Sequence, residues 1–261
     1  MSEFYHTDEV ILYNGDCIDE MNKMAENNQY VDKVITSPPY NLKPHSLWCG
    51  KGQKLYDEYT DDKTDEEYEK WIINIFNLYD KIINHNGAII WNQSYGTQGK
   101  IVLMDIISRI QKETAFDLAD IIAWKKPCCI PINTSQRLSR LCEFVFVFAR
   151  KGEMTTFTTR KKTTIGENGQ TYYENIPNFI ETKERPENQN LNKAVFPVDF
   201  VQKIIDIYVR KDDIVLDNFS GTGTTNYVCL QNNIKSIGIE LSKAQCEYAK
   251  KRLSEVQMKL F

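Results

Sequence analysis

Two stretches of sequence decide the fold: Val31–Tyr40, which reads VDKVITSPPY, and Ile214–Thr225, which reads IVLDNFSGTGTT. Each starts with a short apolar run that is typical of a buried parallel strand, and each then becomes polar. Ligands of open α/β sheets bind just beyond the carboxyl ends of such strands. We therefore expect the two turns to line one site, the first holding a flat polar ring and the second a small anionic or zwitterionic molecule.

Apolar runs alternate with helical patterns along the rest of the chain, as in α/β proteins with a mostly parallel sheet. Further strands are predicted at residues 10–13, 88–91, 121–124, 144–148 and 236–239, so a seven-stranded sheet is expected. A capping box at Thr64 opens a long helix that Asn86 and Gly87 are expected to end. We predict a single Rossmann-like α/β domain over residues 1–261, with helices flanking the sheet.

The composition is that of a globular protein, since 41% of the 261 residues are hydrophobic and 11% are aromatic. No apolar run approaches the ~20 residues of a membrane span, and the N-terminus lacks the basic start and apolar core of a secretory signal. The seven cysteines form an odd set without a Cys-x-x-Cys pair, which argues against a disulfide framework and a zinc site. We expect a cytoplasmic protein with no metal and no membrane partner.

Basic residues are concentrated in one part of the chain, although the net charge is −4. Residues 122–162 contain nine Lys and Arg against two Glu, which leaves +7, whereas acidic residues gather between residues 57 and 69. This segregation favours a face that binds a polyanion. A solvated basic surface is the alternative.

The two turns resemble motifs of the exocyclic-amino DNA methyltransferases that use S-adenosylmethionine. Ser37–Tyr40 resembles that family's catalytic tetrapeptide, whose first residue is Asp, Asn or Ser, and Asp217–Thr225 resembles its cofactor loop. The tetrapeptide precedes the glycine loop, which is the motif order of the β subgroup, and the resemblance spans roughly Leu12–Leu253. It implies S-adenosylmethionine as the cofactor and double-stranded DNA as the partner, with the target base flipped out of the duplex.

The glycine loop offers backbone N–H groups at the start of a helix, a geometry that receives a carboxylate or phosphate. The resemblance implies that the loop holds the methionine part of the cofactor. Glu240 ends the next strand, where a carboxylate can accept hydrogen bonds from ribose hydroxyls. The full predicted cofactor set is Asp16, Cys17, Phe196, Asp217, Phe219, Gly221, Gly223, Thr224, Thr225 and Glu240.

Two members of this set have a structural alternative. The resemblance implies that Asp16 receives the adenine amino group of the cofactor, but a helix N-cap is an equal alternative. Phe196 resembles the family's Phe-Pro residue beside the cofactor, and plain core packing explains it equally well. Asn218 departs from the Pro that is usual in the family's loop.

Ser37, Pro38, Pro39 and Tyr40 are the predicted catalytic residues. An aromatic amine is a poor nucleophile because its lone pair is delocalised, and acceptors aimed at its N–H bonds pull the nitrogen toward tetrahedral geometry. Ser37 Oγ and the Pro38 carbonyl are the expected acceptors, held in place because proline fixes φ. Tyr40 offers a face on which a flipped base can stack. A polyproline-type loop is the alternative for this tetrapeptide.

In the family that the chain resembles, the Ser form of the tetrapeptide leans toward cytosine N4, so the resemblance implies this target, and adenine N6 is the alternative. Lys125, Arg137 and Arg140 are predicted to contact DNA, where Arg137 and Arg140 can meet phosphate or a guanine edge. A solvated surface is the alternative for this arginine pair. Residues 41–63 lack periodicity and are predicted to form a mobile loop, and polar residues 126–190 are predicted to hold a DNA-recognition insertion.

Other chemistries have to be weighed. The Pro127-Cys128 dipeptide matches the nucleophile of cytosine C5 methylation, but the order of motifs is wrong for it, so Cys128 and Cys129 are expected to be small buried residues. An N-methyltransferase acting on RNA or a small molecule, and a non-catalytic DNA-binding module, are the remaining alternatives. A cognate restriction endonuclease is a candidate partner, and both a monomer and a homodimer are compatible with the sequence.

Overall fold

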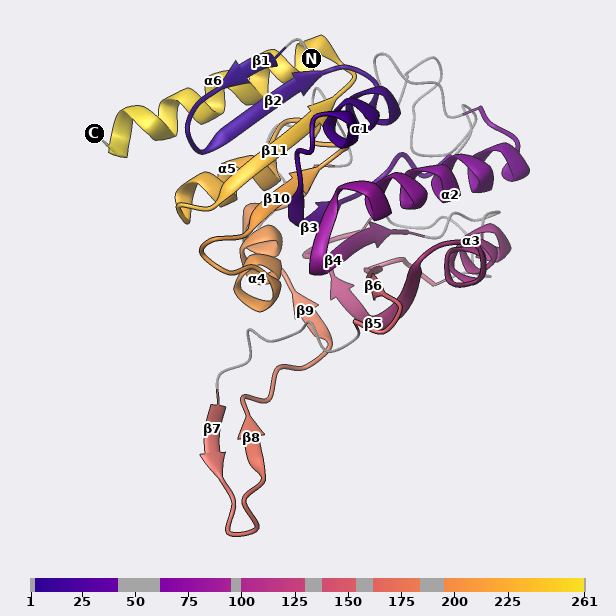
Figure 1. The fold of residues 1–261 in the computed structure, drawn as a ribbon, viewed down its shortest axis with the longest axis vertical. Helices are drawn as coiled ribbons and strands as arrows, with labels where there is room; N and C mark the ends of the chain where they lie inside the picture. Colours follow the sequence, from indigo (N-terminus) through magenta and orange to yellow (C-terminus); the bar gives the residue numbers. More distant parts are fainter. Residues whose placement is uncertain are drawn as a thin grey trace.

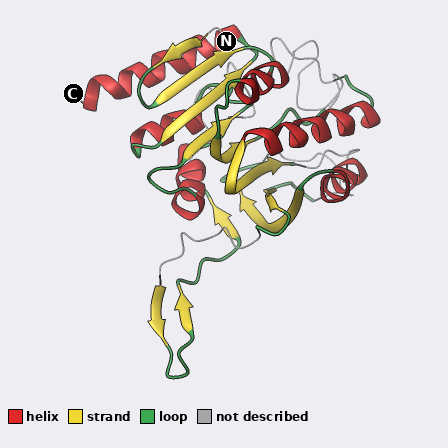
Figure 2. Ribbon diagram, viewed as in Figure 1, coloured by secondary structure: helices red, strands yellow, loops and turns green. Residues whose placement is uncertain are grey.

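The computed structural model describes residues 3–41, 62–94, 100–129, 138–153, 162–183 and 195–260. Its elements are arranged around one large sheet, with a small hairpin set apart from it (Figures 1 and 2). In chain order they are β1 (Glu3–His6), β2 (Val10–Asn14), α1 (Cys17–Glu26), β3 (Val31–Thr36), α2 (Asp65–Ile82), β4 (Ile83–Gln93), α3 (Lys100–Glu113), β5 (Phe116–Lys125), β6 (Cys142–Arg150), β7 (Lys162–Ile165), β8 (Thr171–Tyr173), β9 (Phe179–Glu181), α4 (Val198–Tyr208), β10 (Ile214–Asp217), α5 (Thr224–Gln231), β11 (Lys235–Glu240) and α6 (Lys243–Leu260).

The large sheet has nine strands in the order β1-β2-β11-β10-β3-β4-β6-β5-β9. The strands from β2 to β4 pair in parallel, while β6 is antiparallel to both of its neighbours and β1 is antiparallel to β2. The predicted α/β class with a mostly parallel sheet is confirmed. The predicted count of seven strands was too low. The two outermost strands, β1 and β9, are too short and too exposed to give a strand pattern.

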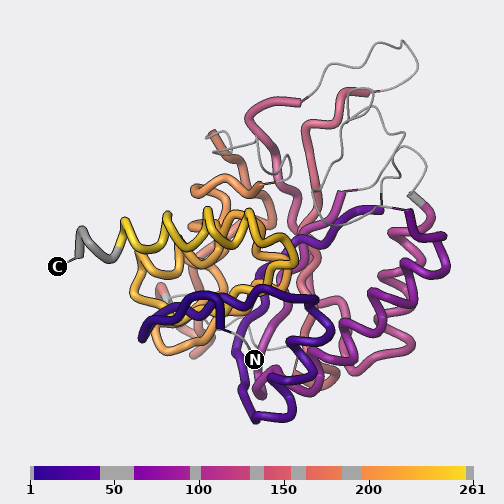
Figure 3. Tube along the Cα trace, turned by 90° about the horizontal axis from the view of Figure 1, so that it is seen from above, coloured from indigo at the N-terminus to yellow at the C-terminus, as the bar shows by residue number. Residues whose placement is uncertain are grey.

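Helices cover both faces of this sheet. The helices α1, α2 and α3 pack in sequence on one face, and α4, α5 and α6 pack on the other (Figure 1). Figure 3 looks from above and shows α6 alongside the N-terminal strands, in agreement with its packing on β2. Among the described residues, no helix combines the length and apolar character that crossing a bilayer requires.

The long helix α2 begins as predicted but ends earlier. Thr64 Oγ1 accepts a hydrogen bond from Glu67 N at 3.2 Å, and the Glu67 carboxylate accepts one from Thr64 N, so the capping box is present. The helix ends at Ile82, and Asn86 and Gly87 lie inside β4 at a break in its register with β3. Asn86 takes a left-handed φ of 61° there. The turn signal of Asn-Gly was therefore real, but it marks a strand irregularity.

The sheet topology decides which side chains share an edge. The carboxyl ends of β2, β3, β4, β5, β10 and β11 lie at one edge, which we call the binding edge. Because β6 runs the opposite way, its start at Cys142 lies at the binding edge and its end at Arg150 lies at the far edge. Arg150 there pairs with Asp80 at 2.8 Å. The described basic residues of the stretch 122–162 are thus divided between the binding edge and the far edge.

The predicted insertion 126–190 contains the hairpin of β7 and β8, which projects beyond β9 at the end of the sheet (Figure 1). Ile165, Tyr172 and Tyr173 on this hairpin are exposed. Residues 42–61 of the predicted mobile loop and the predicted DNA contact Arg137 lie outside the described residues.

Candidate active site

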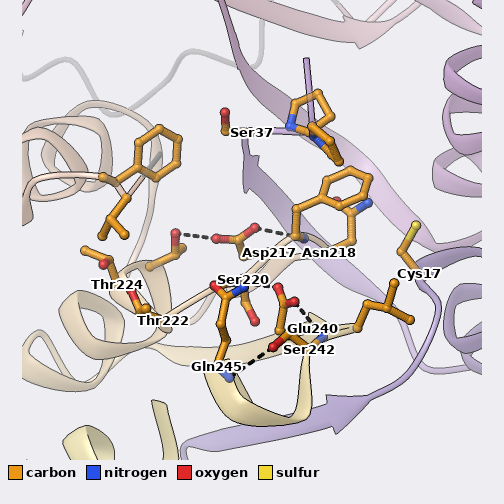
Figure 4. A pocket seen from close by; sticks show the side chains of 18 of the residues that line it. Cys17, Ser37, Asp217, Asn218, Ser220, Thr222, Thr224, Glu240, Ser242 and Gln245 are labelled. Atoms are coloured by element: carbon orange, nitrogen blue, oxygen red, sulfur yellow. Dashed lines mark hydrogen bonds between the residues drawn. The ribbon is translucent and has the colours of Figure 1, made fainter. Parts of the chain in front are cut away.

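A pocket opens at the binding edge, where four strand ends meet (Figure 4). The ends of β2, β3, β10 and β11 supply most of its wall, together with side chains from α2, α6 and the segment before α4. The wall contains Gly15, Asp16, Cys17, Ser37, Pro38, Pro39, Lys63, Trp71, Val195, Phe196, Asp217, Asn218, Phe219, Ser220, Gly221, Thr222, Thr224, Thr225, Glu240, Leu241, Ser242 and Gln245. The two predicted turns therefore line one pocket, as expected.

Asp217 lies at the centre of the polar floor and is 3% exposed. Its Oδ1 accepts hydrogen bonds from Thr36 Oγ1 at 2.7 Å and Phe219 N at 3.2 Å, and its Oδ2 accepts one from Thr225 Oγ1 at 2.7 Å. Burial raises the pKa of Asp217 to about 6, and the three donors counteract part of that rise. The carboxyl group joins β10 to β3 and to the start of α5.

The glycine loop needs its glycines for backbone reasons. Gly221 and Gly223 have positive φ values of 53° and 73°, which is the left-handed region that favours glycine. A Cβ on Gly223 would lie 2.8 Å from Ala249 Cβ on α6, so the close approach of the two elements also requires glycine. Gly223 is the N-cap of α5 and does not line the pocket, so it shapes the loop from behind.

Glu240 is fixed at the rim of the pocket by backbone donors. Its Oε2 accepts a hydrogen bond from Gly221 N at 2.8 Å, and its Oε1 accepts one from Ser242 N at 2.8 Å (Figure 4). Each carboxylate oxygen has two lone pairs, so it can accept more than one hydrogen bond. The bond to Gly221 also ties the end of β11 to the glycine loop.

Asp16 has the structural role that the sequence offered as one alternative, and it also lines the pocket. It is the N-cap of α1, because Oδ1 accepts hydrogen bonds from Ile18 N at 2.8 Å and Asp19 N at 3.3 Å. Both bonds use Oδ1, and the residue also lines the pocket. The neighbouring Cys17 is buried, and burial raises the pKa of its thiol, so this sulfur stays protonated and is not a nucleophile.

An aromatic wall flanks the glycine loop. The rings of Phe219 and Trp71 lie 5.5 Å apart, and the Lys63 ammonium lies 5.5 Å from the Trp71 ring centre. Trp71 belongs to the apolar stripe of α2, whose other members pack into the core. Its position on that stripe gave no signal of a pocket role, because the loop it meets is remote in sequence. Phe196 packs on Phe200 at 5.0 Å, which fits core packing, and it also lines the pocket.

The Ser-Pro-Pro-Tyr turn is held by side chains of β4 and α2. Tyr68 OH donates to the Pro39 carbonyl at 2.7 Å and accepts from Gln93 Nε2 at 3.0 Å. Ser37 Oγ lies 2.9 Å from Tyr40 OH, which donates to Asn92 Oδ1 at 2.8 Å. Ser37, Pro38 and Pro39 line the pocket, while Tyr40 lies outside its wall. The sequence did not point to Asn92, which is buried in a strand that otherwise looks like core.

Two of the predicted DNA contacts, Lys125 and Arg140, lie in different surroundings. Lys125, at the end of β5, forms an ion pair with Glu181 on β9 at 2.6 Å. Arg140 lies just before β6 and is partly exposed. Cys128 is exposed and Cys129 is partly exposed, so the expectation that both are buried was wrong. They follow the end of β5 in an irregular segment and do not reach the core.

Asn218 is a buried polar residue in the lining of the pocket, close to Cys17. Asn218 is 1% exposed, and its Oδ1 accepts a hydrogen bond from Tyr79 OH at 2.7 Å. Its Nδ2 is buried without a hydrogen-bond partner among the described residues. A buried amide donor is costly to leave unpaired, and the residue lines the pocket. The donor-rich loop, the Glu240 carboxylate and the aromatic wall together fit a molecule with a carboxylate, hydroxyls and a flat ring.

Comparisons with known proteins identify the family of this chain. The N6/N4 family model described as DNA methylase matches residues 31–251. The Type II methyltransferase M2.MboI from Moraxella bovis is 27% identical over 263 residues, and the match covers 94% of this chain and 88% of that protein.

Solved structures share the fold. The PvuII DNA methyltransferase, described as cytosine-N4-specific, has a TM-score of 0.71 at 18% identity, with 99% of this chain and 94% of that chain covered. The M1.HpyAVI complex with S-adenosylmethionine has a TM-score of 0.64 at 24% identity, with 94% and 98% covered.

Proposed function

This chain belongs to the N6/N4 family of DNA methylases, which use S-adenosylmethionine, and we propose that it methylates the exocyclic amino nitrogen of a base flipped out of double-stranded DNA. One observation carries the proposal. The turn that ends β3 and the glycine loop that follows β10 line the same pocket and are joined by the bond from Thr36 to Asp217. A base and a methyl donor held there would meet.

The cofactor half of the proposal uses residues that line the pocket shown in Figure 4. The Glu240 carboxylate accepts hydrogen bonds from the ribose hydroxyls, and Asp16 Oδ2 accepts one from the adenine amino group of the cofactor. The glycine loop holds the methionine part. Phe219, Cys17, Phe196, Thr224 and Thr225 complete the binding surface. When bound, S-adenosylmethionine supplies an electrophilic methyl group. Asn218 Nδ2 gains an acceptor from the ligand in this arrangement.

The base half of the proposal uses the Ser-Pro-Pro-Tyr turn. Ser37 Oγ and the Pro38 carbonyl accept hydrogen bonds from the two N–H groups of the target amine. These bonds draw the nitrogen lone pair out of conjugation with the ring. The Pro39 carbonyl accepts a hydrogen bond from Tyr68 OH, which ties the turn to α2. Tyr40 stacks on the flipped base. No covalent intermediate is needed, because holding the two reactants together removes much of the barrier.

We propose cytosine N4 as the target atom and keep adenine N6 as the alternative. A serine at position 37 supports the first, since Ser leads the tetrapeptide mainly in cytosine-N4 enzymes. One hydroxyl acceptor serves either amine, so the base has to be determined by experiment.

DNA contacts are proposed for Lys125, Arg137 and Arg140, and the insertion 126–190 is proposed to read sequence. Lys125 and Arg140 lie near the binding edge, on the same side as the catalytic turn. Lys125 would exchange its partner Glu181 for a phosphate. The relatives named Type II methyltransferases support a site-specific enzyme that works beside a restriction endonuclease of the same recognition sequence.

The test is to incubate purified protein with S-adenosylmethionine and unmethylated plasmid, digest the DNA to nucleosides and analyse them by mass spectrometry. N4-methylcytosine supports the full proposal, and N6-methyladenine supports the reaction with the alternative base. Absence of both products, while calorimetry shows that the cofactor binds, would contradict the proposal.

A further inference from the structure

We propose that Asn92 and Glu143 fix the direction of the hydrogen bonds at Ser37, so that its hydroxyl presents only lone pairs to the substrate and selects an amino group over a carbonyl group. The inference rests on the proposed function, because it concerns the same site. It arises from a polar cluster at the binding edge that consists of Ser37, Tyr40, Asn92, Lys126 and Glu143.

Asn92 sets the first acceptor of the cluster. The residue is 2% exposed, and its Nδ2 donates to the Phe144 carbonyl on β6 at 3.2 Å. This bond fixes the amide orientation, because the NH₂ group has to face the carbonyl. Asn92 Oδ1 is thereby turned toward Tyr40 and accepts its hydroxyl proton at 2.8 Å.

Glu143 sets the second acceptor. Its Oε1 pairs with the Lys126 ammonium, and its Oε2 lies 3.4 Å from Tyr40 OH. An ionised carboxylate only accepts hydrogen bonds. The Tyr40 hydroxyl therefore faces Asn92 Oδ1 and Glu143 Oε2, both acceptors, and its single proton is directed to them.

This arrangement fixes the direction of the Ser37 hydroxyl proton. Ser37 Oγ is 2.9 Å from Tyr40 OH and 3.4 Å from Asn92 Oδ1. Because the Tyr40 proton is engaged elsewhere, the serine hydroxyl donates to the tyrosine oxygen, and its proton points into the cluster. The lone pairs of Ser37 remain for the pocket that this residue lines. An exocyclic NH₂ group can donate to them, whereas the carbonyl oxygen of uracil or hypoxanthine is repelled.

Tyr40→Phe tests this relay, because it keeps the stacking ring and removes only the oxygen. Without that acceptor the Ser37 hydroxyl keeps only the longer contact to Asn92 Oδ1 at 3.4 Å, so it can rotate and donate more readily. Tyr13→Phe is the matched control, since Tyr13 is a buried tyrosine whose hydroxyl pairs with Gln29 at 3.3 Å, outside the cluster. Unchanged cofactor binding and thermal melting establish that each variant is folded.

The measurement is the affinity of the full chain, with S-adenosylhomocysteine present, for oligonucleotides that carry its methylation site. That site is first located by mapping the methylated bases in plasmid DNA. The target base is either the amino form or its oxo analogue, cytosine against uracil or adenine against hypoxanthine. For each protein, the ratio of its affinity for the amino oligonucleotide to its affinity for the oxo oligonucleotide gives the amino preference. We expect this ratio to be ~10-fold or more higher for the wild type and Tyr13→Phe than for Tyr40→Phe, because only an intact relay excludes the carbonyl. Comparing variants on the same two oligonucleotides cancels differences in base-pair strength.

Tyr40→Phe is also expected to methylate ~10-fold more slowly at saturating DNA. Glu143→Gln is expected to lower both the amino preference and the methylation rate, since its amide can turn a donor toward Tyr40. A wild-type amino preference retained in Tyr40→Phe would overturn the relay while leaving the methyltransferase function intact. A wild type that methylates no base in DNA would overturn the proposed function together with the relay.

Discussion

Thr36 donates its hydroxyl proton to Asp217 at 2.7 Å, although 181 positions separate the two residues in the chain. Both groups are buried, and they join the strand that carries the catalytic turn to the strand that carries the glycine loop. The bond thus couples the proposed base site to the proposed cofactor site through the sheet itself. Its strength depends on the protonation state of one carboxyl group.

Asp217→Asn is expected to change how stability depends on pH. Burial raises the pKa of Asp217 from 3.8 to about 6, so the folded state holds this proton more tightly than the unfolded state does. The resulting stabilisation is complete below about pH 3.8 and is lost as the pH rises through about 6. Between pH 4 and 7 the free energy of unfolding of the wild type should fall by about 1–3 kcal/mol relative to the variant.

Urea unfolding at several pH values checks this, with Asp206→Asn as the control because Asp206 lies exposed on α4. The control should track the wild type at every pH. A constant difference between wild type and Asp217→Asn from pH 4 to 7 would show that Asp217 does not titrate in this range.

Tyr40→Ala is expected to give a folded protein that binds the cofactor and methylates poorly. Base stacking contributes ~1–3 kcal/mol, so methylation at low DNA concentration should fall by ~5- to 150-fold. Cofactor affinity should stay within ~2-fold, because Tyr40 lies outside the wall of the pocket. Steady-state methylation and calorimetry measure the two quantities, and unchanged turnover would refute the stacking role.

Glu240→Gln is expected to weaken S-adenosylmethionine binding by ~10-fold, which corresponds to one charge-assisted hydrogen bond. The amide would place an NH₂ group against Gly221 N or Ser242 N, both of which are donors. Glu247→Gln on the exposed face of α6 is the matched control. Equal affinities of the two variants in calorimetry would remove Glu240 from the cofactor site.

Cys128→Ala is expected to keep full methylation activity. Cys128 is exposed and does not line the pocket, so it is not placed to attack a base held by Ser37 and Tyr40. Tritium transfer to DNA is a suitable assay. Abolished turnover in a variant that melts like the wild type would revive the cytosine C5 alternative.

Much of the site could be predicted from the sequence because its motifs are local. The Ser-Pro-Pro-Tyr turn, the glycine loop and Glu240 each follow a strand whose apolar run is visible, and parallel strands bring their carboxyl ends together. The Thr64 capping box is equally local, and it opens α2 as predicted.

The remaining features depend on pairing between distant segments, which the sequence does not reveal. Asn92 and Glu143 look like ordinary members of two strands, and they reach the catalytic turn only because β4 pairs with β6 at that level. The same antiparallel pairing carries Arg150 to the far edge, which is why the described basic residues of the stretch 122–162 are not all at the binding edge. Trp71 lines the pocket from a helix stripe that otherwise packs into the core.

The most direct test of the account is single-turnover methylation by Ser37→Ala beside the wild type, with cofactor affinity measured on the same preparations. Removing one preorganised acceptor from the reacting group should slow methyl transfer by ~100-fold or more, while S-adenosylmethionine affinity stays within ~2-fold. That result would place Ser37 at the reacting amine. A Ser37→Ala protein that transfers methyl groups to DNA at the wild-type rate would contradict the account.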